Sequence, residues 1–145
     1  MSRKSDADLA VAPVSNPASG VVCSKKKLRI VLVDDHVVVR RGLAGLFRTE
    51  PDMEIVGEAS DGESAVYLIR EAQPDFVLMD VGLPGMDGIQ ATRIIHSELP
   101  EVRIIGLSMF QTEELSAAMR EAGAVDYISK GVPFENIIAA IRACA

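Results

Sequence analysis

The chain has 145 residues, of which 48% are hydrophobic, and this is enough for one globular domain with a buried core. Its formal net charge of −6 argues against a free-standing nucleic-acid binder, and 4% aromatic residues without Trp argue against a stacking platform for bases. The charge is uneven, because residues 1–27 carry a net +3 and residues 28–145 a net −9. The positions of those carboxylates are therefore the first question.

Residues 1–27 are rich in Ser, Ala, Pro, Asn and Lys and show no sustained periodicity. They are predicted to form a disordered leader or linker, with a basic docking arm at Lys25–Lys27 as the alternative. Since no apolar run is long enough to span a membrane or to act as a secretory signal, we expect a cytoplasmic protein without membrane contact. Cys23 and Cys144 lie far apart without a CxxC pattern and are expected to be free thiols.

From Leu28 onward, five short apolar runs rich in Val and Ile predict strands. They are mostly continuous instead of alternating, which is typical of strands that are buried on both faces of a parallel sheet. The five runs are Leu28–Val33, Glu54–Ala59, Phe76–Met79, Arg103–Leu107 and Val125–Ile128.

The segments between and after these runs have helical spacing. Leu115, Ala118, Met119 and Ala122 follow the pattern i, i+3, i+4, i+7, and the same spacing recurs from Phe134 to Ile141. Further helices are predicted along Val39, Leu43 and Phe47, along Ala91, Ile95 and Leu99, and over Gly62–Ala72 with Asp61 as its N-cap. Strict alternation of strand and helix predicts one α/β domain over residues 28–145, built on an open, doubly wound, five-stranded parallel sheet with helices on both faces.

Ligands bind such sheets outside the carboxyl ends of the strands. The first strand leads into Asp34 and Asp35, the third into Asp80, the fourth into Ser108 and the fifth into Lys130. We therefore expect three carboxylates, a hydroxyl and an ammonium group to meet at one edge of the sheet.

Two carboxylates about 5 Å apart repel by roughly 3 kcal/mol at an effective dielectric near 20, so such a cluster needs compensation. Mg²⁺ prefers oxygen ligands and would provide it. Lys130 can pair with a carboxylate or with a phosphoryl oxygen, and Ser108 can donate a hydrogen bond to the same group. The chemistry indicated is phosphoryl transfer onto an aspartate. Each residue also has a simpler interpretation: a lone Asp34 or Asp35 could cap a helix, and a lone Lys130 could be solvated.

These residues form a recognisable set of motifs. Ile30–His36 contains an acidic pair after the first strand, Val77–Asp80 is followed by Leu83–Gly88, and Ser108, Tyr127 and Lys130 complete the set. From Leu28 to Ala143 the sequence resembles the receiver domain of a two-component response regulator. The resemblance implies the flavodoxin-like strand order 2-1-3-4-5.

The resemblance also implies roles at the site. Asp80 would accept a phosphoryl group from a phosphohistidine on a sensor histidine kinase or phosphotransfer protein. Asp35, Asp80 and the backbone carbonyl of Gly82 would bind Mg²⁺ directly, whereas Asp34 would act mainly through a metal-bound water. The chain would catalyse only its own aspartyl phosphorylation and dephosphorylation.

Lys130 and Ser108 would hold the phosphoryl oxygens. Ser108 and Tyr127 would also form the switch, which changes the surface of the fourth helix, fifth strand and fifth helix to control an output. For Tyr127 the alternative is a half-buried strand aromatic without a special role.

Finer features resemble NarL/FixJ-type receivers, namely Val33–His36, residues 58–63, Leu107–Phe110 and Lys130 followed by Gly131. This favours part of a transcriptional response regulator, with a possible receiver homodimer. The alternatives are the C-terminal receiver of a hybrid sensor histidine kinase and a stand-alone receiver. Since no helix-turn-helix segment follows Ala145, we expect this chain itself to bind no nucleic acid.

Three other classes fit less well. An aspartate-based phosphohydrolase would need a second aspartate two residues after the nucleophile, but position 82 is glycine. A nucleotide- or flavin-binding module would need a phosphate-binding loop after the first strand, where Asp34 and Asp35 would repel phosphate. A degenerate receiver would lack key residues, yet all of them are present.

Overall fold

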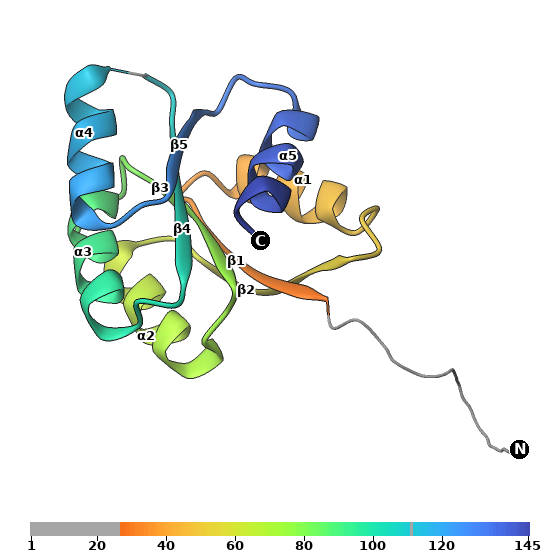
Figure 1. The fold of residues 1–145 in the computed structure, drawn as a ribbon, viewed down its shortest axis with the longest axis horizontal. Helices are drawn as coiled ribbons and strands as arrows, with labels where there is room; N and C mark the ends of the chain where they lie inside the picture. Colours follow the sequence, from red (N-terminus) through yellow and green to blue (C-terminus); the bar gives the residue numbers. More distant parts are fainter. Residues whose placement is uncertain (1–26, 111) are drawn as a thin grey trace, which may run out of the picture.

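The computed structural model describes residues 27–110 and 112–145, so the predicted leader, except for Lys27, and Cys23 within it lie outside the described residues. Strands and helices alternate along the chain (Figure 1). The strands are β1 (Leu28–Val33), β2 (Met53–Ala59), β3 (Phe76–Asp80), β4 (Arg103–Ser108) and β5 (Asp126–Ser129). The helices are α1 (Val37–Phe47), α2 (Gly62–Ala72), α3 (Gly88–Glu98), α4 (Glu113–Ala122) and α5 (Phe134–Cys144).

The five strands form one parallel sheet in the order β2-β1-β3-β4-β5, which confirms the predicted class and strand order. Two predicted strand ends differ by one residue in a way that matters. Asp80 and Ser108 are the last residues of β3 and β4, because Asp80 pairs with Leu107 and Ser108 pairs with Ser129 in the ladder. Backbone pairing therefore continues one residue beyond the apolar runs and fixes the backbones of both polar residues.

Two apolar layers hold the helices against the sheet. Helices α2, α3 and α4 cover one face, and α1 and α5 cover the other (Figure 1). The second layer includes an edge-to-face contact between Phe47 of α1 and Phe134 of α5, whose ring centroids are 5.0 Å apart. Burial on both faces leaves the ends of the central strands as the places where polar side chains can gather.

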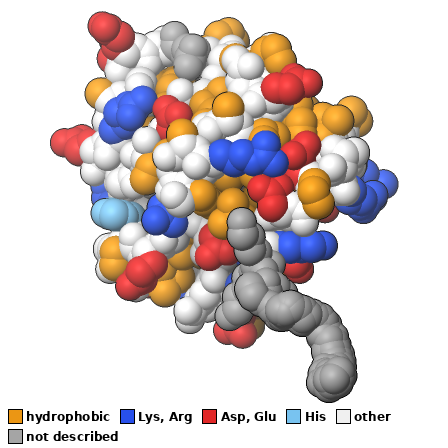
Figure 2. Space-filling model, turned by 45° about the vertical axis from the view of Figure 1, so that its right-hand side comes forward, with side chains coloured by type: hydrophobic (Ala, Val, Ile, Leu, Met, Phe, Trp, Pro, Cys, Tyr) orange, Lys and Arg blue, Asp and Glu red, His pale blue; other side chains and the backbone are white. Residues whose placement is uncertain are grey.

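The space-filling view shows acidic and basic side chains interspersed with hydrophobic ones over the face that it presents (Figure 2). No broad patch of one sign is visible on that face. Among the described residues, no helix combines the length and the apolar character needed to cross a membrane. Cys144, at the end of α5, is half-buried and free of a disulfide.

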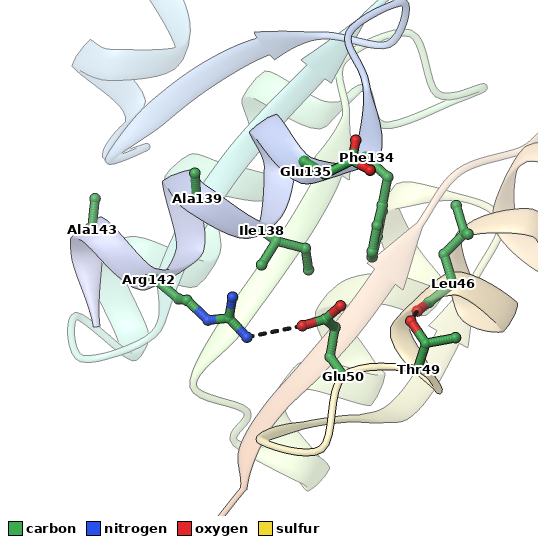
Figure 3. A pocket seen from close by; sticks show the side chains of 9 residues that line it. All are labelled: Leu46, Thr49, Glu50, Phe134, Glu135, Ile138, Ala139, Arg142 and Ala143. Atoms are coloured by element: carbon green, nitrogen blue, oxygen red, sulfur yellow. Dashed lines mark hydrogen bonds and ion pairs between the residues drawn. The ribbon is translucent and has the colours of Figure 1, made fainter.

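A groove lies between α1 and α5, as the close-up shows (Figure 3). Leu46, Phe134 and Ile138 supply apolar walls, and Arg142 closes one side through an ion pair of 2.9 Å with Glu50. Its basic group, Arg142, pairs with Glu50, and the groove gathers no cluster of acidic and basic side chains like the one at the strand ends. The candidate chemistry lies instead at the carboxyl ends of the strands.

Candidate functional site

Three charged side chains meet at the carboxyl edge of the sheet. The ammonium nitrogen of Lys130 lies 2.8 Å from Oδ2 of Asp34 and 3.2 Å from Oδ2 of Asp80. The side chains of Lys130, Asp34 and Asp80 are only 6%, 3% and 5% exposed. The structure thus brings together, away from solvent, three of the groups that strand-end placement singled out.

Local backbone contacts hold each of these residues in place. Asp34 follows β1, and its backbone N–H donates to the carbonyl of Ala59 at 3.0 Å. Oδ1 of Asp80 accepts the backbone N–H of Gly82 at 3.0 Å. The backbone N–H of Lys130 donates to the carbonyl of Ser108 at 2.9 Å, which brings the loop after β5 toward β4. The site therefore depends on the sheet register and the short loops that follow the strands.

The two buried carboxylates differ in their acidity. Burial raises the pKa of Asp34, but contacts with Lys130 and His36 outweigh it and leave the pKa below its ordinary value. Burial also raises the pKa of Asp80, and the charge of Asp34 adds to this effect. The N–H of Gly82 and the ammonium of Lys130 do not offset the rise. Asp80 is thus the carboxylate whose negative charge is least compensated.

The same environment keeps Lys130 protonated. Burial lowers its pKa, but the contacts with Asp34 and Asp80 outweigh burial and raise the pKa above its ordinary value. A charged ammonium therefore faces the two buried carboxylates throughout the physiological pH range.

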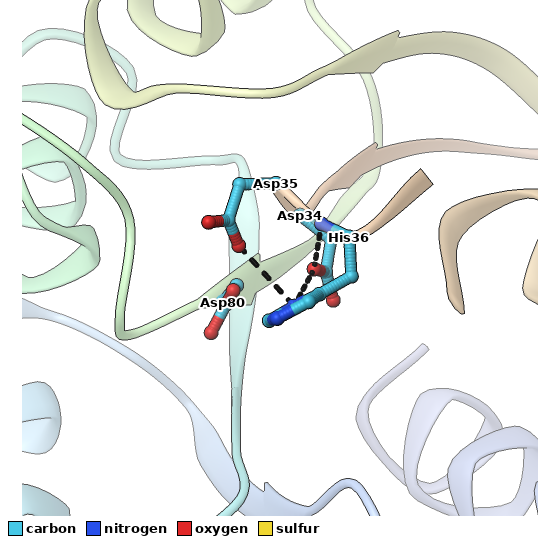
Figure 4. A group of neighbouring side chains, drawn as sticks. All are labelled: Asp34, Asp35, His36 and Asp80. Atoms are coloured by element: carbon cyan, nitrogen blue, oxygen red, sulfur yellow. Dashed lines mark hydrogen bonds and ion pairs between the residues drawn. The ribbon is translucent and has the colours of Figure 1, made fainter. Parts of the chain in front are cut away.

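Asp35 and His36 form the exposed rim of the site (Figure 4). Nδ1 of His36 lies 3.0 Å from Oδ1 of Asp34 and 3.2 Å from Oδ1 of Asp35. Asp34, Asp35, His36 and Asp80 each offer one ligand atom, and these four atoms lie within 4.8 Å of one another. The fourth side chain of the group is thus a histidine between two of the carboxylates.

This donor set fits a divalent cation. Oδ2 of Asp34 and Oδ2 of Asp80 are buried and accept no hydrogen bond from the described residues. Lys130 lies within ion-pair distance of both oxygens, but its single positive charge faces two carboxylates and leaves Asp80 undercompensated. Carboxylate oxygens are ligands for hard cations. The cluster therefore could bind a metal ion.

Ser108 is at the same edge, but its hydroxyl does not contact the charged cluster. It donates to the carbonyl of Phe110 at 2.9 Å, and the Tyr127 hydroxyl donates to the same carbonyl, also at 2.9 Å. Tyr127 is only 5% exposed, more deeply buried than a half-buried strand aromatic. One backbone oxygen thus connects the hydroxyl nearest the site to an aromatic residue of β5.

Position 82 is the open side of the cluster. Gly82 is exposed, and a Cβ built there would lie 3.9 Å from Oδ1 of Asp80 with no other atom within 4 Å. A side chain at this position would lie beside the carboxylate of Asp80, and glycine leaves that space free.

Sequence patterns did not identify two contributors to this site. Arg40 donates from Nη1 to the carbonyl of Asp34 at 2.6 Å and from Nε to Glu58 at 2.9 Å, and so ties α1 to β1 and β2. The carbonyl of Phe110 is a backbone group, which no sequence motif reports. Arg40 could have been suspected, because it lies one helical turn after His36.

Comparison with known proteins agrees with this geometry. The response regulator receiver domain model matches residues 30–142. The transcriptional regulatory protein LiaR of Bacillus subtilis is 44% identical over 118 residues, which is 81% of this chain and 56% of LiaR. The receiver domain of the putative response regulator NarL from Mycobacterium tuberculosis is 32% identical, with a TM-score of 0.78, over 82% of this chain and 96% of that one.

A third similar structure is the complex of CheX, CheY, BeF₃ and Mg²⁺ from Borrelia burgdorferi. Its matched chain is 26% identical, with a TM-score of 0.77, over 82% of this chain and 90% of that chain. The fold and the site define a phosphorelay signalling module of α/β type. The chain belongs to the response regulator receiver domain family, and its relatives include NarL- and LiaR-type regulators. It spans about half the length of the curated relatives that it matches.

Proposed function

We propose that this chain is a phosphorylation-controlled receiver in which Asp80 accepts a phosphoryl group in the presence of Mg²⁺. The observation that carries this proposal is the position of Asp80, a buried carboxylate at a strand end whose charge is undercompensated although Lys130 lies 3.2 Å away. Such a group gains from a cation and can act as a nucleophile. An ordinary structural aspartate would be exposed or fully paired.

The metal ligands in this proposal are Asp35, Asp80 and the backbone carbonyl of Gly82, with Asp34 acting through a water. Mg²⁺ at this position would neutralise charge on the transferred oxygens. The buried lone pairs of Asp34 and Asp80 and the open side at Gly82 support this assignment. In the similar CheY complex from Borrelia burgdorferi, Mg²⁺ is present together with BeF₃.

The transfer itself exchanges one bond for another. A carboxylate oxygen of Asp80 attacks phosphorus, the P–N bond of a partner's phosphohistidine breaks, and the imidazole leaves with the bonding electron pair. The ammonium of Lys130, already placed by the two carboxylates, would then pair with a phosphoryl oxygen. The new group brings about −1.5 to −2 charges and three acceptor oxygens to the site.

The switch proposed for Ser108 and Tyr127 follows from their shared acceptor. To donate to a phosphoryl oxygen, the Ser108 hydroxyl would have to release the carbonyl of Phe110, to which Tyr127 also donates. The loop after β4 and the surface of α4, β5 and α5 would then rearrange. These two hydrogen bonds to one carbonyl support a physical link between the two residues.

The proposal also covers the output that the receiver controls and the proteins that it binds. Transcriptional regulators such as LiaR are about twice as long as the matched segment, which favours a receiver that controls a transcriptional output. A hybrid-kinase receiver and a stand-alone receiver are the alternatives. Residues 28–145 would form the receiver unit, with a sensor histidine kinase or phosphotransfer protein as phosphodonor, receiver homodimerisation as a further possibility and the cytoplasm as the expected compartment.

Phosphorylation tests the assignment of Asp80. We expect acetyl phosphate with Mg²⁺ to add one phosphoryl group to the wild-type chain and none to the Asp80→Asn variant, as measured by intact-mass spectrometry. Asp52→Asn, an exposed carboxylate outside the site, is the matched control and should be labelled like the wild type. Equal labelling of the Asp80→Asn variant would contradict the proposal.

Metal titration tests the proposed ligands. Asp35→Ala should weaken Mg²⁺ binding by at least about tenfold, because it removes an ionised oxygen ligand from the rim. Calorimetric titration of the metal-free chain measures this affinity directly. An unchanged affinity would remove Asp35 from the set of metal ligands.

A further inference from the structure

A glycine lies inside one of the central strands. Gly106 is in β4 between Ile105 and Leu107, and the ladder pairs it with Met79 of β3 on one side and with Tyr127 of β5 on the other. Glycine weakens the interior of a strand, because it loses more conformational entropy than other residues and packs no side chain. Strand formation therefore does not explain Gly106, and the reason lies in what packs over it.

Two side chains fill the space above Gly106. A Cβ built there would lie 2.8 Å from Cε of Met119 in α4 and 3.0 Å from Cδ1 of Tyr127 in β5. Both distances are shorter than an ordinary contact between carbon atoms, which is about 3.5–4.0 Å. The end of the Met119 side chain and the edge of the Tyr127 ring therefore occupy the volume that a methyl group at position 106 would need.

Both side chains are also held by contacts beyond Gly106. Met119 is completely buried, and the hydroxyl of the equally buried Thr92 in α3 lies 4.0 Å from its sulfur. The hydroxyl of Tyr127 donates to the carbonyl of Phe110, which also accepts the hydroxyl of Ser108. The space above β4 is thus the place where the loop next to the charged cluster meets the packing of α3 and α4.

We propose that Gly106 is a positioning residue of the switch, which lets the Tyr127 ring and Met119 share one space so that a movement of the ring displaces α4. The inference rests on the switch of the proposed function, in which Ser108 releases the carbonyl of Phe110. Because protein interiors are close-packed, a change in the position of the ring changes the space that is left for Met119. A methyl group at position 106 would separate the two side chains and break this link.

Fluorine NMR of the chain labelled with 3-fluorotyrosine tests the position of the ring without phosphorylation. The chain has two tyrosines, and the exposed Tyr67 provides an internal reference for the buried Tyr127. We expect Gly106→Ala to shift the Tyr127 resonance toward that of Tyr67 and to leave the Tyr67 resonance in place. Adding Met119→Leu should restore the wild-type resonance, because leucine lacks the Cε atom and keeps most of the side-chain volume.

Gly57→Ala is the matched control, since Gly57 lies inside β2 and its added Cβ would lie 2.9 Å from Cδ2 of Leu68. This variant introduces comparable crowding in a different strand. It should leave the Tyr127 resonance unchanged, so a shift in Gly106→Ala alone separates positioning of the ring from a general loss of stability.

Hydrogen exchange in α4 measures whether the ring acts on the helix. After acetyl phosphate and Mg²⁺ are added, amide protection in α4 should change in the wild type and in Gly57→Ala. Gly106→Ala should lose this change although it still accepts a phosphoryl group, and the double variant with Met119→Leu should regain it. Met119→Leu alone, a conservative change that leaves a gap where Cε was, should weaken the response.

An unchanged Tyr127 resonance in Gly106→Ala would overturn the inference, and so would a wild-type response of α4 in that variant. If Gly106→Ala does not fold, a wild-type response of α4 in Met119→Leu would overturn it instead. Failure of every variant and of the wild type to accept a phosphoryl group would contradict the proposed function, whereas the resonance shift and its rescue would still support the role of Gly106.

Discussion

Asp80 is the residue at which the requirements of function and stability oppose each other. Its carboxylate is buried beside Asp34, and its pKa is raised because burial and that neighbouring charge outweigh the hydrogen bond from Gly82 and the ion pair with Lys130. An ionised Asp80 therefore costs stability in the absence of a cation. The same uncompensated charge makes the site receptive to a metal ion and to phosphoryl chemistry.

In the presence of a chelator, Asp80→Asn should accordingly stabilise the metal-free protein, since it removes a buried charge that its surroundings undercompensate and keeps the shape. The gain should be present above the raised pKa of Asp80. It should vanish as the pH falls below 3.8, the ordinary Asp value, where the carboxyl is protonated in both the folded and unfolded states. Urea unfolding at several pH values measures the difference. A variant less stable than the wild type at neutral pH would contradict this account.

Strand-end placement in the sequence was sufficient to identify Asp34, Asp80 and Lys130 as neighbours. It could not reveal that the ring of His36 turns toward the carboxylates, because the N-cap position alone does not fix a rotamer. It also could not reveal that the hydroxyl of Ser108 faces the carbonyl of Phe110. Those details depend on side-chain torsions and on a backbone acceptor, which hydrophobic patterns do not encode.

At the scale of whole elements, the strands were predicted to within about one residue because their apolar runs are short and each is followed by a polar residue. The remaining differences lie where the ladder continues past the apolar run, as at Asp80 and Ser108. The helix α3 ends at Glu98, and Leu99, the last member of its predicted apolar stripe, is the C-cap. Apolar periodicity continues into the cap because that residue still packs against the core.

The start of α3 is pressed against the strand that carries Asp80. A Cβ built on Gly88 would collide with the backbone carbonyl of Asp80 and with Cα of Val81, neither of which can move independently of β3. Glycine at this position therefore permits the close approach of helix and strand. The spacing of α3 from the site depends on the absence of one methyl group.

We expect Gly88→Ala to destabilise the fold by about 1–3 kcal/mol, the usual cost of overpacking, and to slow phosphorylation of Asp80 by acetyl phosphate. Gly42→Ala is the matched control, because Gly42 lies inside α1 with nothing within 4 Å of its added Cβ. That variant should gain about 0.5–1 kcal/mol from helix propensity. Thermal unfolding and mass spectrometry measure the two effects, and equal behaviour of the two variants would refute the packing argument.

At the scale of the whole molecule, the net charge of −6 argues against nucleic acid as a binding partner. It does not indicate where a cation would bind. The buried acidic cluster gives that charge a local meaning, because a bound divalent cation would relieve repulsion that the fold otherwise tolerates. Folding stability and metal binding should therefore be linked.

A Mg²⁺ concentration of about 100 times the dissociation constant should raise the free energy of unfolding by about 2.7 kcal/mol in the wild type. The Asp80→Asn variant should show little of this gain, whereas Asp52→Asn should retain it, because Asp52 pairs with Arg142 outside the site. Chemical unfolding with and without Mg²⁺ measures the difference. A similar gain in all three proteins would indicate non-specific ion binding.

The parallel sheet also determines where the described chain leaves the domain. β1 begins at Leu28, whose N–H donates to the carbonyl of Asp52, and Asp52 pairs with Arg142 near the end of α5. Both described ends therefore lie at the sheet edge opposite Asp80, about 17–20 Å away for strands of this length. A fluorophore attached to Cys144 would observe the chemistry from a distance without obstructing it. A partner that contacts these ends directly would likewise sense phosphorylation through changes transmitted along the body of the receiver.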